Sequence, residues 1–524
     1  MPIPATPTGP LAAHANDSDP GRVVDRQRVA RTVLGHGILL GIAGDALLRE
    51  NAVGLNVTIW LLALVAAVVA VTHAQHGRIA PAQREPLAAA IAFALLLTLR
   101  DAPLLAVAAI VASLGSTALA ALVAAPGALP PLSRLPVRAI VDAGARFVPQ
   151  GLVGAIFFLV GDARLVVRGE RRALAVTRVV VQAVGLAVAA GWLLLTLLRA
   201  GDAVFARTTD SLFAWSPPNV LQHVVFAALF AWPALGWLHR WSAYRGPLDL
   251  PVPLPTLSAT NATTVLSTMN IVFVAFLAVQ VRVLFGGQAY VQAVTGLTLA
   301  EYARSGFFAL VVTTAVVLVT LLALDGAAAQ GALAGVRRHR LLATSLVAMV
   351  ALLLLSALVR MRLYMDAFGL SIDRVYATVA MAWITIALVG FGATVLRGRS
   401  DAFVAVALRS GWAVLLAVAI ADPEGAVARS NLARAAAARG AFDAPYHATL
   451  SADATPALVA ALAAAPPDST TCAVAWRLMQ RNDADHGFAT WNLGRVRARD
   501  AVSAAAPTWR AACPRVAADT PRVP

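Results

Sequence analysis

The residues best suited to chemistry in this chain of 524 residues lie between positions 280 and 304. Gln280 and Arg282 stand near the end of one apolar run, and Glu301 and Arg304 stand just before the next. A carboxylate at the boundary of an apolar environment can have a raised pKa, which suits a general acid or base, so Glu301 is the candidate for catalysis. The alternative is a structural ion pair of Glu301 with Arg282 or Arg304, and we favour that interpretation.

Two further ionisable residues, Asp45 and Arg409, lie inside other apolar runs. Charged side chains in such positions are costly and mark functional sites by default. The two residues could pair with each other and form a structural clasp or a polar cavity. In the alternative that we favour, Asp45 lies at the head-group boundary beside Arg49, and Arg409 extends to the interface or binds a backbone carbonyl.

Apolar segments of membrane-spanning length have to position these side chains. Eleven stretches have about the length that crosses a hydrocarbon core, roughly 20 residues, and they predict an all-α fold, a polytopic membrane helical bundle of about 11 transmembrane helices. Gly35, Gly37, Gly41 and Gly44 in the first stretch predict close packing against another helix. The predicted spans are 32–48, 54–72, 86–99, 103–125, 179–198, 220–238, 265–285, 306–324, 341–359, 375–395 and 403–420.

The composition indicates a membrane protein and excludes several functional classes. Hydrophobic residues make up 59% of the chain and charged residues only 13%, so the bilayer has to be the main solvent. The formal net charge is +15, but positive-inside topology explains these charges better than nucleic-acid binding. All 42 basic residues are arginine. Without a lysine, the chain cannot contain a Walker A loop or form a Schiff base with pyridoxal phosphate.

The distribution of arginines predicts the topology. With eleven spans, every strong arginine cluster between spans lies on the cytoplasmic side, which places the N-terminus inside and the C-terminus outside. A short apolar run at 147–160 contains Pro149, Gly151 and Gly154, and these interruptions favour an interfacial or re-entrant helix over a twelfth span. This helix would lie in a cytoplasmic loop at 126–178. Glycines at 286 and 287 predict a turn between the spans that flank them.

The chain divides into a membrane domain and polar ends. Residues 1–30 and 507–524 predict disordered tails, 31–421 the transmembrane helical domain, and 422–506 a small soluble helical domain. The only two cysteines, Cys472 and Cys513, could form a disulfide if the C-terminal part is exported. Two unpaired thiols in a reducing compartment are the alternative. Apolar positions at helical spacing predict soluble helices at 426–438, 456–464, 472–479 and 491–504.

Several motifs carry a resemblance to a known family. The most specific runs from Leu284-Phe285-Gly286-Gly287 to Glu301-Tyr302-Ala303-Arg304, and weaker ones are Arg100-Asp101, Gly201-Asp202-Ala203-Val204-Phe205, Leu450-Ser451-Ala452-Asp453-Ala454-Thr455-Pro456-Ala457-Leu458, and Trp491-Asn492-Leu493 with Arg495. The pattern resembles a large group of bacterial polytopic membrane proteins of unknown function, the domain-of-unknown-function families 4153 and 4173. The resemblance implies a multispan membrane fold in the bacterial envelope and no established reaction. Val283 and Ala309 depart from the pattern, which usually has an aromatic and an acidic residue there.

Three functions remain open. We favour a non-catalytic protein of the bacterial cytoplasmic membrane that senses, anchors or assembles through exported C-terminal helices, with an envelope protein as partner. The alternative is a transporter of a small solute or lipid, with Arg409, Asp45, Gln182 and Asn270 as polar cavity groups. A membrane-embedded transferase using Glu301 is less favoured, because no catalytic motif is present. We predict that the protein binds no metal, cofactor or nucleic acid. Its predicted partner besides an envelope protein is the lipid bilayer.

Overall fold

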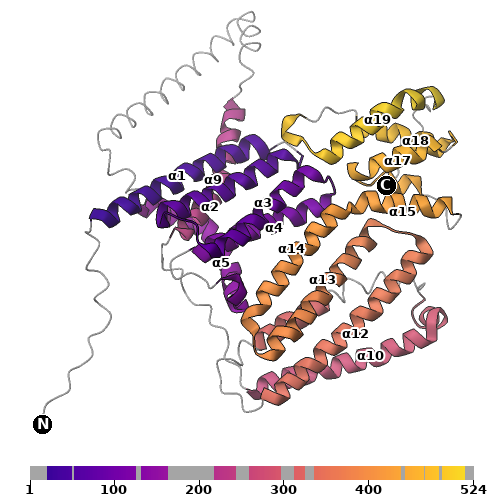
Figure 1. Ribbon diagram of the computed structural model, residues 1–524, viewed down its shortest axis with the longest axis horizontal. Helices are drawn as coiled ribbons and strands as arrows, with labels where there is room; N and C mark the ends of the chain where they lie inside the picture. The colour runs from indigo at the N-terminus through magenta and orange to yellow at the C-terminus, as the bar shows by residue number, and fades with distance from the viewer. Residues whose placement is uncertain are drawn as a thin grey trace, which may run out of the picture.

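The computed structural model describes residues 20–49, 52–124, 131–162, 217–242, 259–296, 312–324, 336–437, 443–464, 466–482 and 487–513. Throughout these ranges the regular secondary structure is helical, which confirms the predicted all-α fold (Figure 1). Eight of the described helices are long and apolar enough to cross a membrane, so this is a multi-pass membrane protein. Of the other predicted spans, 179–198 lies outside the described residues, 220–238 forms a helix that is not among the eight, and 306–324 is described only from residue 312.

A first group of membrane helices comes from the N-terminal half of the chain. Helix α1 packs along α9, α3 packs along α4, and α5 packs along α9. Buried apolar residues such as Val68, Phe158 and Leu238 join these helices. Their bounds are α1 Pro20–Leu48, α2 Leu55–His76, α3 Pro81–Leu99, α4 Pro103–Ala124, α5 Val137–Phe157 and α9 Pro217–Trp241, with a 3-10 turn at Leu132–Arg134 and a π-helical turn at Phe158–Asp162.

A second group of membrane helices packs around a separate apolar core that includes Leu266, Leu346 and Phe391. It consists of α10 Ala259–Thr295, α12 Val336–Phe368, α13 Ile372–Thr394 and α14 Phe403–Ala421, with 3-10 turns at Val395–Arg397 and Ser400–Ala402. Helix α14 contacts α13 on one side and α4 and α3 on the other. It therefore connects the two groups, as Figure 1 shows.

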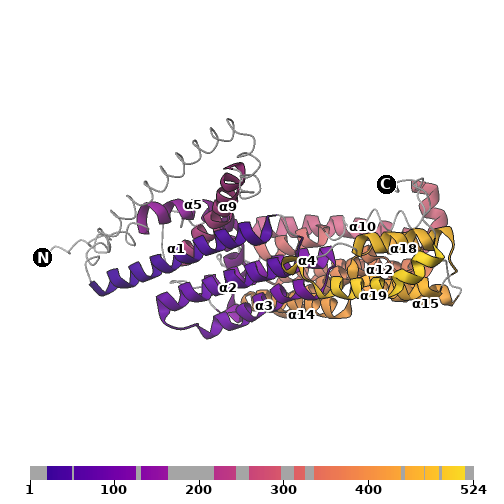
Figure 2. The same cartoon turned by 90° about the horizontal axis from the view of Figure 1, so that it is seen from above.

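The C-terminal helices form a small unit with its own core of Leu458, Leu478 and Trp509. Side-chain caps define where its helices begin: the Asp422 carboxylate accepts from the Gly425 amide, and the Asn492 carbonyl oxygen accepts from the amides of Gly494 and Arg495. Figure 2 shows this unit at one end of the molecule. The helices are α15 Pro423–Ala436, α16 Ala444–His447, α17 Thr455–Ala464, α18 Ser469–Asn482 and α19 Leu493–Ala512, with 3-10 turns at Ala452–Ala454 and Phe488–Thr490.

A disulfide closes the C-terminal unit. Cys472 in the first turns of α18 is joined to Cys513, which directly follows α19, and their Cα atoms are 5.4 Å apart. Both cysteines are buried. The bridge spans a sequence separation of 41 residues and fixes the end of α19 against α18. Cross-links of this kind stabilise a small domain chiefly by restricting its unfolded chain.

Three boundaries predicted from the sequence are wrong. Helix α1 begins at Pro20, so the polar segment predicted to end at residue 30 is partly helical. Helix α19 continues through Pro507 to Ala512, although a proline inside a helix costs roughly 3 kcal/mol. Burial of Ala506 and Trp509 in the C-terminal core, together with the disulfide, holds this last turn.

The third wrong boundary is the turn predicted at Gly286 and Gly287. Helix α10 passes through both residues and ends at Thr295, where Gly296 takes a left-handed φ of 71°. A glycine weakens a helix by only about 1 kcal/mol relative to alanine, so a pair of glycines is not by itself a stop signal.

The glycines of the run at 147–160 do not interrupt its helix either, because α5 is continuous from Val137 to Phe157. They permit a close contact with α9. A Cβ on Gly154 would lie 2.6 Å from the carbonyl oxygen of Gly236, and a Cβ on Gly236 would lie 2.1 Å from that of Gly151. The interfacial position of this segment stays a prediction, but its glycines serve helix packing.

The glycines of α1 have the packing role predicted for them, with one exception. A Cβ on Gly41 would lie 2.5 Å from the carbonyl oxygen of Ala227 on α9 and 2.6 Å from the Cβ of Ala231. Gly37 and Gly44 face Leu235 and Phe230 of the same helix. Gly35 has no such neighbour within 4 Å.

We expect Gly41→Ala to destabilise the protein, because the new methyl group has no room between α1 and α9. Overpacking of this kind typically costs about 1–3 kcal/mol. The measurement is the Tm of the purified protein in detergent. Gly35→Ala on the same helix is the matched control, and it should leave the Tm unchanged or slightly raised. An equal Tm of the two variants would contradict the close contact between α1 and α9.

Candidate functional site at the junction of the membrane helices and the C-terminal helices

The stretch that the sequence singled out for chemistry lies mostly beyond the structural description. Glu301 and Arg304 lie outside the described residues. Gln280 and Arg282 are on α10, but the side chain of Arg282 is also outside the description. The ion pair between Arg282 and Glu301 therefore stays a prediction.

Asp45 lies beside Arg49, as the favoured interpretation expected, and it has a further partner; its position at the head-group boundary stays a prediction. The Nδ1 of His223 on α9 is 2.6 Å from one Asp45 carboxylate oxygen, and the Arg49 Nε is 3.5 Å from the other. An Arg49 guanidinium nitrogen is in turn 3.3 Å from the His223 Nε2. The three side chains close one end of the α1–α9 contact, so their geometry indicates a structural clasp.

Arg409 pairs with a residue that the sequence analysis missed. Its Nε and terminal nitrogen donate to the two carboxylate oxygens of Glu85 on α3, at 2.5 and 2.7 Å. Pairing with Asp45 and binding to a backbone carbonyl are thus both wrong. Such a bidentate pair suits arginine, because the planar guanidinium group matches the geometry of a carboxylate. Glu85 was overlooked because the third span was predicted to start at residue 86, whereas α3 starts at Pro81.

The densest polar network lies where the C-terminal helices meet the membrane helices. Asp101, in the short turn between α3 and α4, forms its centre. Its backbone amide donates to the Asp453 carboxylate at 2.8 Å, and its own carboxylate accepts from the Ala452 amide at 3.2 Å. The other Asp101 oxygen is 2.6 Å from the Arg495 guanidinium on α19. One residue of the membrane domain is therefore bonded to three residues of the C-terminal unit.

Asn492 makes a second attachment beside the first. Its side-chain amide donates to the carbonyl oxygens of Leu97 and Arg100, both at 2.8 Å, at the end of α3. The same side chain caps α19 with its carbonyl oxygen. Asn492 is 1% exposed, and its bonds with Leu97 and Gly494 are buried while those with Arg100 and Arg495 are partly buried. This residue satisfies the end of one helix and the start of another.

Arg100 ties the same turn to α14. Its guanidinium donates to the carbonyl oxygens of Ala419 and Ile420, at 2.8 and 3.2 Å, and lies 3.4 Å from the Asp422 carboxylate. These groups lie at the point where α14 ends and α15 begins. The junction consequently joins both groups of membrane helices to the C-terminal unit.

Two carboxylates of the junction are buried. The pKa of Asp453 is raised to about 6, chiefly by burial, while the hydrogen bond from the Asp101 amide lowers it. The negative charges of Asp422 and Asp101 also raise this pKa, and the positive charge of Arg100 lowers it. Burial likewise raises the pKa of Glu424, whose carboxylate accepts from the Ser451 amide. Arg481, from α18, donates to the carbonyl oxygens of Ala448 and Leu450, which lie just before Ser451 in the chain.

The chemical capacity of the junction is that of an attachment. Its main polar groups bond to each other or to the backbone, as an attachment requires. Within the described ranges, no group of three His, Cys, Asp or Glu residues could hold a metal ion. The sequence did carry a signal for this site, since Arg100-Asp101, Leu450 to Leu458 and Trp491-Asn492 with Arg495 are three of the motifs behind the family resemblance.

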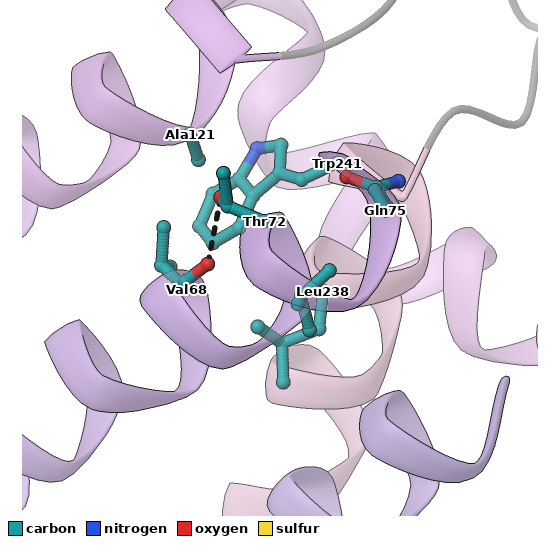
Figure 3. Close-up of a pocket in the computed structure, with 7 residues that line it drawn as sticks. Val68, Thr72, Gln75, Ala121, Leu238 and Trp241 are labelled. Carbon is teal, nitrogen blue, oxygen red and sulfur yellow. Dashed lines mark hydrogen bonds between the residues drawn. The ribbon is translucent and has the colours of Figure 1, made fainter. Parts of the chain in front are cut away.

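A small pocket lies at the opposite end of α2, against α4 and α9 (Figure 3). The hydroxyl of Thr72 donates to the Val68 carbonyl oxygen at 2.8 Å, and the buried amide nitrogen of Gln75 has no partner among the described residues. The lining holds no ionisable side chain and supplies no acid or base. It consists of Val68, Val71, Thr72, Gln75, Ala121, Leu238 and Trp241.

Removing the Asn492 side chain should loosen α19 from the membrane helices. Asn492→Ala leaves the buried carbonyl oxygen of Leu97 and the partly buried one of Arg100 without this donor, and it removes a helix cap, at an expected cost of about 2–3 kcal/mol. We expect hydrogen exchange at the first amides of α19 to accelerate roughly 30-fold or more. Asn482→Ala is the matched control, because Asn482 donates to the Leu478 carbonyl within its own helix. Equal exchange of α19 in the two variants would contradict the assigned role.

The attachment should also depend on pH. An aspartate has a pKa of 3.8 when unperturbed and about 6 at position 453, so the folded state binds this proton more tightly. The resulting stability is fully present below pH 3.8 and is lost as the pH rises through 6. We therefore expect the C-terminal unit to be more resistant to unfolding at pH 5 than at pH 8, by about 1 kcal/mol or more.

Hydrogen exchange of α19 between these two pH values, corrected for intrinsic rates, measures this effect. Asp453→Asn should remove most of the difference, leaving the part that comes from Glu424. Asp500→Asn, at an exposed position of α19, should preserve it. An unchanged pH dependence in Asp453→Asn would assign the effect to another group.

Comparison with known proteins identifies one family. Residues 87–461 match the family model described as a domain of unknown function, DUF4153. The match runs from α3 to α17 and includes Asp101, Glu424 and Asp453 of the junction. No curated protein and no solved structure matches the chain. Because the match covers more than half of the chain, this multi-pass membrane protein belongs to the DUF4153 family.

Proposed function

We propose that this protein is a non-catalytic component of the bacterial cell envelope that holds a helical domain in a fixed orientation on the outer face of the cytoplasmic membrane, where it binds an envelope protein. The observation that carries the proposal is the junction. Asp101 and Asn492 fasten the C-terminal unit to α3, and Arg100 fastens the same turn to α14. A partner that binds the unit is thereby coupled to both groups of membrane helices.

The positions of the charges support an exported C-terminal unit. The unit attaches at the turn between α3 and α4, whereas Arg78 lies in the turn between α2 and α3, at the other end of these helices. Arg397 and Arg399 lie in the turn between α13 and α14, again at the end away from the unit. Arginine-rich turns favour the cytoplasmic side, which puts the C-terminal unit outside.

The disulfide supports the same orientation. Bridges such as Cys472–Cys513 form and persist in oxidising compartments, including the bacterial periplasm, and are rare in the cytosol. The arginine distribution and the disulfide are independent features of the chain, and both favour an exported C-terminal unit with the N-terminus inside.

The structure gives less support to transport. The transport hypothesis required Arg409 to line a polar cavity, but its side chain pairs with Glu85 and both are about half exposed, at 50% and 42%, on the surface of the described helices. Asn270 is the better placed polar residue: it is buried between α10 and α12, and its carbonyl oxygen has no partner among the described residues. One acceptor does not define a path through the membrane.

Photocrosslinking in living cells tests the proposed function. A benzophenone amino acid at Arg477, an exposed position on α18, should give adducts with a protein of the envelope, because this surface faces away from the core of the unit. Adducts are detected by mobility and identified by mass spectrometry. The same amino acid at Arg78, exposed at the other end of the bundle, is the matched control and should give adducts with cytoplasmic proteins alone.

Loosening the junction provides the second arm of this experiment. Asn492→Ala should lower the adduct yield from position 477 several-fold, because the unit no longer has a fixed orientation. Cytoplasmic adducts from position 477 would overturn the orientation. If Asn492→Ala leaves the adduct yield from position 477 unchanged, the rigid attachment is not needed for partner binding.

A further inference from the structure

The turn that precedes α19 exposes two aromatic side chains. Phe488 is 78% exposed and Trp491 is 40% exposed, although both belong to the compact C-terminal unit. They lie in and directly after the 3-10 turn Phe488–Thr490, and Gly487 before them has open space around it. Large apolar side chains exposed together on a folded unit indicate a surface that is covered in the working protein.

The backbone of this turn is fixed at the ends of the membrane helices. The Leu55 amide, at the first residue of α2, donates to the Trp491 carbonyl oxygen at 3.0 Å. Asn492, the next residue, bonds to carbonyl oxygens at the end of α3. Both helices are long and apolar enough to span the membrane, so their ends mark the boundary of the hydrocarbon core. The backbone of Trp491 is thus bonded directly to a residue at that boundary.

The apolar surface of the spans continues to the turn. Val53, before α2, is 38% exposed; Leu99, at the end of α3, is 45% exposed; and Leu104, at the start of α4, is 57% exposed. Val53 and Leu99 lie at the ends of α2 and α3 that hold the turn, and Leu104 lies at the start of α4, which follows α3 directly. Exposed apolar side chains thus lie both in the turn and at the nearby ends of helices long and apolar enough to cross a membrane, which favours lipid as the occupant.

We propose that the segment Gly487–Trp491, here called the aromatic turn, inserts into the head-group layer of the bilayer and anchors the C-terminal unit to the lipid surface. Aromatic side chains favour this layer because the ring is apolar while the indole N–H and the neighbouring backbone remain hydrated. The anchor acts beside the Asp101 and Asn492 attachments and restricts tilting of the unit. It requires only that the unit lies on a membrane surface, so it is independent of the orientation proposed above.

A fluorescent label placed in the turn tests the insertion. The two cysteines of the chain are bonded to each other, so Gly487→Cys supplies a single reactive thiol while Phe488 and Trp491 stay in place. The full chain in phosphatidylcholine nanodiscs is labelled with an environment-sensitive maleimide dye. We expect lipids with a nitroxide near the head group to quench this label at least twofold more than lipids with a deep nitroxide, and aqueous iodide to quench it weakly.

Two further variants make the result specific. Ser503→Cys, at an exposed position of α19, should be quenched by iodide and not by nitroxide lipids. Phe488→Ser in the Gly487→Cys protein should shift the label toward iodide quenching at least twofold, because the most exposed ring is gone without loss of packing. A label at position 487 that responds like the one at 503, or that is protected from both quenchers, overturns lipid insertion. A Phe488→Ser protein with unchanged quenching overturns the role of the aromatic ring.

Discussion

The central contact between the C-terminal unit and the membrane helices is a reciprocal one, the exchange of hydrogen bonds between the Asp101 turn and the segment Ala452–Asp453. Each side offers a backbone amide to the carboxylate of the other, and Arg495 neutralises the charge of Asp101. Carboxylates away from water are tolerated only when their oxygens are bonded and their charge is balanced. Removal of one partner would leave a partly buried group of this network without its hydrogen bond.

This constraint explains how two separate groups of membrane helices behave as one support. The cores around Phe158 and around Phe391 have no buried residue in common, and the link between them runs through α14. Arg100 binds the last carbonyl oxygens of α14, while its neighbour Asp101 binds the C-terminal unit. The unit therefore rests on the place where the two groups meet, and also on the turn between α12 and α13, where the amides of Leu370 and Ile372 donate to Asn431 and Tyr446.

Hydrophobicity and length were enough to predict the all-α fold, because a run of about 20 apolar residues has few alternatives to a membrane helix. Helix ends were less predictable: Pro507, Gly286 and Gly287 lie inside helices, where packing and cross-linking outweigh local propensity. Glu85 was missed through such an error, since α3 starts five residues before the predicted span.

The junction could not be predicted as a site for a different reason. Asp101 resembles an ordinary loop charge and Asn492 an ordinary helix cap, and spacing along the chain does not reveal which distant residue each one meets. Charged residues inside apolar runs stand out in a sequence, because placing a charged side chain in lipid is costly. At the junction, the cost of burying a carboxylate cannot be seen in the sequence, because Asp453 and Glu424 become buried only in the assembled fold.

The distance along the chain between the partners at Asn492 has a consequence for biogenesis. Its side chain bonds to carbonyl oxygens 395 and 392 residues earlier, so the docking surface is made long before the helix that occupies it. The surface also needs the end of α14 on the same side of the membrane as the turn after α3. If one intervening span failed to insert, these two ends would emerge on opposite sides and α19 would find only half of its contacts. The final helix can thus complete its contacts only when the turn after α3 and the end of α14 lie on the same side of the membrane.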